Sequence, residues 1–123
     1  MQIIHTQNAP QAIGPYSQAI KSGGFIFASG QIALDSQNSF PHTDIREQTI
    51  QVLKNLQAIL ESQGSSLQKV IKTTIFLTDM DNFGIVNEVY AEFFGPHKPA
   101  RSTIGVKELP RGALVEIECI ALD

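Results

Sequence analysis

The stretch Leu114–Leu122, which reads LVEIECIAL, decides the fold class. It alternates with the two-residue period of a β-strand, so that Val115, Ile117, Cys119 and Ala121 share one face. The opposite face carries two glutamates between further apolar residues. A strand that is apolar on both faces belongs inside a sheet whose two faces are both covered.

Four further segments have the β-branched and aromatic composition that is typical of strands. The first two are joined by a pair of glycines, which predicts a β-hairpin. The predicted strands are Ala19–Lys21, Phe25–Ala28, Val70–Leu77 and Ala100–Val106.

Two segments have helical periodicity. The first begins near Asp44, with Glu47 placed as in a capping box, and ends near Gly64. The second is expected to begin at a cap formed by Asp81 and to stop at Gly95. Two helices and five or six strands in 123 residues predict a single α+β domain over residues 1–123, with both helices on one face of the sheet.

The second face of such a sheet has no helix left to cover it. Because its strands are apolar on that side too, a neighbouring copy of the chain is the simplest cover. The sequence therefore predicts a homo-oligomer.

Composition argues against several classes of partner. The net charge is −3 and the nine Lys and Arg residues are scattered, so we expect no nucleic-acid partner. No apolar run is long enough to span a membrane and no signal-peptide pattern is present, so we expect no membrane partner. A single cysteine forms no intrachain disulfide, which favours a reduced, cytoplasmic protein. His5, His42 and His97 share no ligand spacing, so no metal site is predicted.

The candidate chemistry lies on the last two strands. Glu116 and Glu118 point to one face of their strand, and Arg101 and Thr103 have the same spacing on the preceding strand. We expect these strands to pair as an antiparallel ribbon, in which the register decides the glutamate that Arg101 meets. One interpretation is an ion pair within an oligomer interface. The other is a small-anion site, in which Arg101 binds a carboxylate through two hydrogen bonds and a glutamate acts on a water.

Three other residues leave two interpretations open. Tyr16, in a turn, either packs or presents its hydroxyl to a site. Asn87, on the apolar face of the second helix, either bonds nearby backbone or lies at the edge of a pocket. Cys119 fits a small buried residue better than a nucleophile.

A set of motifs occurs in order along nearly the whole chain, from about Asn8 to Leu122. They are Asn8–Pro10 (NAP), Ile13–Gln18 (IGPYSQ), Ser29–Ile32 (SGQI), Val70–Leu77 (VIKTTIFL), Val86–Tyr90 (VNEVY), Phe93-Phe94, Pro99–Ser102 (PARS) and Val115–Glu118 (VEIE). In this combination they resemble the Rid family of small imine deaminases, also called the YjgF/YER057c family. The resemblance implies a chorismate-mutase-like α+β fold, a homotrimer, and active sites in clefts between subunits.

The resemblance also implies roles for particular residues. The family's carboxylate-binding arginine falls on Arg101, its water-holding glutamate on Glu116, and its turn tyrosine on Tyr16. Two residues after the arginine, many members carry cysteine where this chain has Thr103. Threonine can replace cysteine there if the position contributes only its backbone to binding of the water. Substrate-binding positions fall on Ser29, Gly30, Phe83, Asn87 and Thr103.

The implied reaction is hydrolysis of 2-imino acids, such as 2-iminobutanoate and 2-iminopropanoate, to 2-keto acids and ammonia. Pyridoxal-phosphate dehydratases acting on threonine or serine, as in isoleucine biosynthesis, release such imines. No cofactor is expected, because the imine carbon is already electrophilic. The alternatives are a regulatory module that binds 2-keto acids without turnover and, against the acidic charge of the chain, a ribonuclease or translation inhibitor.

Overall fold

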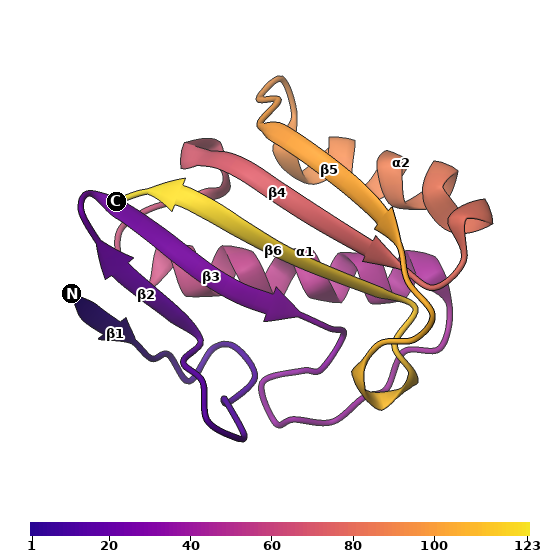
Figure 1. The fold of residues 1–123 in the computed structure, drawn as a ribbon, viewed down its shortest axis with the longest axis horizontal. Coiled ribbons are helices and arrows are strands. Elements are labelled where there is room, and N and C mark those ends of the chain that lie inside the picture. The colour runs from indigo at the N-terminus through magenta and orange to yellow at the C-terminus, as the bar shows by residue number, and fades with distance from the viewer.

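The computed structural model describes residues 1–123 as a six-stranded sheet with two α-helices behind one of its faces (Figure 1). The strand order is β1-β2-β3-β6-β4-β5, and every neighbouring pair is antiparallel except β4 with β5. This confirms the predicted α+β class and adds β1, a short N-terminal strand that the sequence analysis did not predict. The strands are β1 (Gln2–Ile4), β2 (Ala19–Ser22), β3 (Phe25–Gln31), β4 (Val70–Leu77), β5 (Ala100–Gly105) and β6 (Val115–Leu122), and the helices are α1 (Ile45–Glu61) and α2 (Phe83–Phe94).

Strand β6 lies in the interior of the sheet, between β3 and β4. Its burial alternates along the strand as the sequence predicts, with every second residue buried from Val115 to Ala121. These side chains join the apolar stripe of α1, including Val52, Leu53 and Leu56, in one core. The other face of β6, which carries both glutamates, receives no helix.

Helix α1 begins and ends where the sequence predicts. The Asp44 side chain accepts a hydrogen bond of 2.8 Å from the backbone N–H of Glu47. After the helix, Gly64 adopts φ of 75°, and the N–H of Ser65 bonds to the carbonyl of Leu60 at 3.1 Å. This is a Schellman turn, in which glycine supplies the left-handed residue.

The expected Asp81 cap is wrong. The side chain of Asp79 accepts from the N–H of Asp81, and a single 3-10 turn, Met80–Asn82, intervenes before α2 begins at Phe83. Asp79 caps this 3-10 turn, and the N-cap position of α2 falls on Asn82, whose side chain makes no capping hydrogen bond. The predicted stop is confirmed, since Gly95 follows α2 with φ of 59°.

The expected β5–β6 ribbon is also wrong. Strand β5 pairs in parallel with β4, and β4 lies between β5 and β6. The reason is the connection: β4, α2 and β5 form a βαβ unit, whose helical crossover returns the chain parallel to its starting strand. The sequence order of β5 and β6 did not predict their spatial order.

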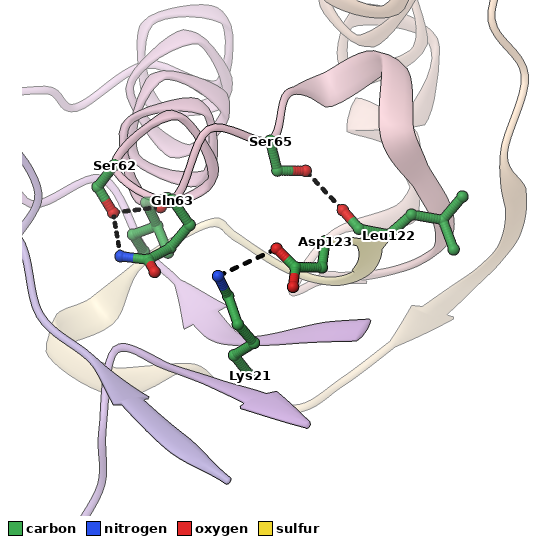
Figure 2. Close-up of polar contacts among 7 residues, drawn as sticks. Lys21, Ser62, Gln63, Ser65, Leu122 and Asp123 are labelled. Atoms are coloured by element: carbon green, nitrogen blue, oxygen red, sulfur yellow. Dashed lines mark hydrogen bonds and ion pairs between the residues drawn. The ribbon is translucent and has the colours of Figure 1, made fainter. Parts of the chain in front are cut away.

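The end of β6 is fastened to neighbouring elements (Figure 2). The Ser65 hydroxyl, in the turn after α1, donates to the Leu122 carbonyl at 2.6 Å. Lys21 of β2 forms an ion pair of 3.0 Å with Asp123. These contacts help to hold the register of the strand that carries the glutamates.

The face of the sheet opposite the helices remains open in the single chain. It exposes large apolar side chains from the interior strands β3 and β6 and from the edge strand β5, with Phe27 and Leu122 each 45% exposed and Ile104 43% exposed. A lone chain would therefore present a wide apolar surface to water. Neither helix is long and apolar enough to cross a membrane.

Candidate active site

Glu116 lies on the open face of β6, in register with Phe76 of β4. Its side chain is half-buried, and burial raises the pKa of the carboxyl group above its ordinary value. The negative charge of Glu118 raises this pKa further. No basic side chain in the chain forms an ion pair with Glu116. A carboxyl group whose pKa is raised in this way is a stronger base when ionised than an ordinary carboxylate, which suits it to accepting a proton.

Strand β3 accommodates Glu116 by a β-bulge. Ala28 pairs with Cys119 and Gln31 with Ile117, so β3 contains one residue more than β6 over this interval. Bulges of this kind re-aim backbone and side chains beside functional sites. A Cβ atom added to Gly30 would overlap the Glu116 carboxyl group. Only glycine at this position allows the carboxyl group to stay where it is.

A cavity of about 710 Å³ surrounds this carboxyl group. It brings together four of the predicted residues, Tyr16, Ser29, Gly30 and Glu116. Tyr16 is 54% exposed and its ring is available to a ligand or to a second chain. The Ser29 hydroxyl donates to the Ser17 carbonyl at 2.6 Å, which ties the bulge to the turn that carries the tyrosine.

Amide side chains that the sequence did not single out as site residues also shape this cavity. Gln18 is buried, accepts from the N–H of Thr6 at 2.7 Å and donates to the Pro10 carbonyl at 2.8 Å. The Asn38 side chain accepts from the backbone N–H of Gln11 at 2.9 Å and donates to the Gln11 carbonyl at 3.1 Å. Only Asn38 left a signal in the sequence, because asparagine tolerates the left-handed backbone, φ 61°, that it adopts there.

Arg101 lies elsewhere, in a second cavity of about 530 Å³ that Asn87 also lines. Its guanidinium carbon is 5.0 Å from the ring centroid of Tyr90 and 5.3 Å from that of Phe83. No hydrogen bond or ion pair within the chain uses its side chain. Five N–H donors are therefore free to bind an anion, and a planar carboxylate fits them best.

The predicted residues thus fall into two groups. Arg101 is in register with Thr73 and faces the helix side of the sheet, whereas Glu116 is on the open side. No cavity of the single chain contains both. Thr103 is in register with Ile75, on the same side as Arg101, and lines neither cavity. Phe83, expected as an apolar wall of the site, lies beside the guanidinium group of Arg101.

The remaining candidates carry no visible chemistry. Cys119 is buried on the helix face, and burial raises the pKa of its thiol to about 12, so the thiol is neutral at physiological pH. The fold brings no three His, Cys, Asp or Glu side chains together in a metal-binding arrangement.

Comparison with known proteins identifies the family of the chain. A family model described as Endoribonuclease L-PSP matches residues 6–123. The chain belongs to this family, to which the Rid proteins belong. It is 54% identical over 121 residues to a RutC family protein of Pyrococcus horikoshii, and the matched region covers 98% of this chain and 96% of the relative. It is 46% identical over 121 residues to the chloroplastic Reactive Intermediate Deaminase A of Arabidopsis thaliana, and the matched region covers 98% of this chain and 65% of the relative.

Solved structures of the Rid family share the fold. YyfA of Yersinia pestis, described as a Rid family protein of unknown function, superimposes with a TM-score of 0.96 at 50% identity, over 99% of this chain and 98% of that one. Escherichia coli TdcF with bound serine gives a TM-score of 0.95 at 42% identity, over 100% and 99% of the two chains. The predicted resemblance to the Rid family is confirmed.

The raised pKa of Glu116 predicts a pH-dependent stability. A carboxyl pKa that is higher in the folded state makes stability fall as pH rises from the ordinary value, about 4.3, through the raised value. Glu116→Gln removes this ionisation, so the variant should melt at a higher temperature than wild type at pH 7. The advantage should disappear near pH 4. Thermal unfolding at both pH values checks this, and an advantage that is equal at both would contradict it.

The close approach of Gly30 to Glu116 predicts a specific effect of substitution. Gly30→Ala should push the carboxyl group toward solvent, so its pKa should fall toward the ordinary value. A carboxyl-detected NMR titration of Glu116 measures this shift. Gly84→Ala is the matched control, because its added Cβ meets nothing within 4 Å. An unchanged Glu116 titration in Gly30→Ala would show that the two residues are not in contact.

Proposed function

We propose that this protein hydrolyses small 2-imino acids, such as 2-iminobutanoate and 2-iminopropanoate, to 2-keto acids and ammonia. One observation carries the proposal: the chain presents a half-buried carboxyl group with a raised pKa, and an arginine whose donors are all unpaired. The first suits a proton acceptor, and the second suits a carboxylate clamp. The name of the Arabidopsis relative and the serine bound to the E. coli neighbour support the same chemistry.

The complete site is proposed to form between two copies of the chain, in a homotrimer as the family resemblance implies. Arg101 and Glu116 lie on opposite faces of one sheet and in separate cavities, so one chain cannot bring them to the same substrate. The open sheet face offers an apolar surface for a neighbouring copy through Phe27, Ile104 and Leu122. Each cleft would then combine the Glu116 cavity of one subunit with the Arg101 cavity of the next.

The chemistry follows from these positions. Arg101 binds the substrate carboxylate and orients the imine carbon over Glu116. Ionised Glu116 takes a proton from water as the water oxygen attacks that carbon, and returns the proton to the nitrogen, which gives a neutral carbinolamine. Glu116 then takes the proton of the new hydroxyl group and passes it to the nitrogen, so the carbon–nitrogen bond breaks and ammonia leaves as the carbonyl forms. Tyr16 and the backbone of Ser29 and Gly30 border the space where water and substrate meet. Positioning and one acid–base group suffice for an already reactive imine.

An imine-trapping assay tests the activity. An amino-acid oxidase generates the imine, and semicarbazide competes for it. Wild-type protein should suppress the trapped product, and Arg101→Ala should not, because the carboxylate clamp is lost. Glu116→Ala separates an enzyme from a binding module: it should lose suppression yet still bind a 2-keto acid. If wild type suppresses no imine but binds keto acids, the protein is a binding module and the proposal is wrong.

Mixing inactive variants tests the shared site. Arg101→Ala and Glu116→Gln subunits should each be inactive alone. After the two are unfolded together and refolded, about a quarter of the interfaces should join an intact Arg101 to an intact Glu116 and recover activity. Refolding each variant alone is the control. No recovery from verified mixed oligomers would place both residues in a site within one chain.

The family description as an endoribonuclease suggests a competing activity. Two features weigh against it in this chain: the net charge is −3, and one cavity pairs Glu116 with Glu118. Phosphate contacts need clustered cations and weaken steeply with added salt. If the dialysed protein cleaves RNA, and the cleavage rate falls steeply as salt is added, the ribonuclease activity would be favoured over the deaminase.

A further inference from the structure

We propose that Tyr90, held in place by Thr73, is a positioning residue that sets the orientation of the Arg101 guanidinium group. This inference rests on the proposed function, since it assigns Arg101 the role of carboxylate clamp. Tyr90 acts through the arginine, and its hydroxyl group is used inside the protein.

The arginine needs an external support. Arg101 lies on β5, an edge strand, and is exposed. No polar group of its own chain bonds to it, and the rings of Tyr90 and Phe83, at 5.0 and 5.3 Å, lie against its guanidinium group. Rings hold a guanidinium group by its face and leave the N–H edges free. An acidic partner would fix it equally well but would occupy the donors that a ligand requires.

Tyr90 is itself fixed on two sides. Its hydroxyl and that of Thr73 are 2.8 Å apart, and Thr73 is fully buried. Phe94 stacks on the tyrosine ring with centroids 4.4 Å apart and an interplanar angle of 28°. The ring plane is therefore determined by the core and not by the ligand.

The fold brings the three residues together through the βαβ unit. Thr73 on β4 and Arg101 on β5 are direct partners in the parallel register, so both face the helix side of the sheet. The intervening helix α2 then places Tyr90 over both. Threonine anchors the hydroxyl end of the ring, and the arginine meets its face.

This arrangement has a consequence for binding. A carboxylate that accepts two parallel hydrogen bonds requires the plane of the guanidinium group to be held. An arginine that is oriented before the ligand arrives loses less side-chain freedom on binding. Tyr90, which lines the same cavity as Arg101, therefore contributes affinity for the carboxylate through the orientation of the guanidinium group.

Affinity for 2-oxobutanoate, a keto acid, tests this inference by NMR titration in a double-mutant cycle. Tyr90→Leu should weaken binding about tenfold when Arg101 is present. In an Arg101→Lys background, which keeps the charge but lacks the planar fork, the same change should cost less than about twofold. Tyr90→Phe keeps the ring and its stacking on Phe94 but loses the hydrogen bond to Thr73, so its affinity should lie between those of wild type and Tyr90→Leu. In turnover, Tyr90→Leu should raise KM more than it lowers kcat.

A matched control separates positioning from general damage. Val86→Ala removes buried volume from the same helix at a residue that lines neither cavity. It should lower the melting temperature and leave the affinity unchanged.

The outcomes are distinct. Equal losses for Tyr90→Leu in both Arg101 backgrounds, with wild type binding normally, would overturn this inference alone. Loss of affinity in Val86→Ala equal to that in Tyr90→Leu would also overturn it, since damage to the helix would then explain both. A wild-type protein that binds no 2-keto or 2-imino acid would overturn the proposed function and this inference together.

Discussion

The structure depends on the strict alternation of side chains along β6. This strand is hydrogen-bonded on both sides, by β3 and by β4, so it cannot rotate or slip without breaking two ladders. One face supplies Val115, Ile117 and Cys119 to the core under α1. The other face holds the glutamates outside that core. A register shift of one residue would bury both acids under the helix at a large desolvation cost, so the packing of the core also determines the position of the chemistry.

The two halves of the proposed site are built by different means. The surroundings of Glu116 are formed by irregular backbone. The β-bulge at Gly30 makes room for the carboxyl group, and amide side chains such as Gln18 hold the adjacent loop by hydrogen bonds. The surroundings of Arg101 are formed by regular secondary structure. The parallel β4–β5 register positions the side chain, and the crossover helix supplies the rings that support it. Each half lies in its own cavity, on its own face of the sheet. This separation is the physical argument for our proposal that an assembly of chains completes the site.

Local patterns predicted the features that depend on local energetics. Asp44 caps α1 and Gly64 ends it, because these interactions lie within a few residues of each other in the sequence. The same reasoning failed at Asp81, where Asp79 caps a 3-10 turn that precedes the helix. It failed again for the β5–β6 ribbon, since the pairing of strands depends on the handedness and length of connections between them, which the composition of a strand does not record.

The sequence by itself determined the fold class, the division of β6 into an apolar and an acidic face, and, through its motifs, the family. These follow from periodicity and from residue types at fixed spacing, which survive without knowledge of the neighbours. Only the tertiary structure decided that Gly30 lies against Glu116, that Tyr90 and Thr73 support Arg101, and that the arginine and the glutamate are on opposite faces. Those relations join residues far apart in the chain, and they depend on strand order and register, which core packing determines for the sheet as a whole.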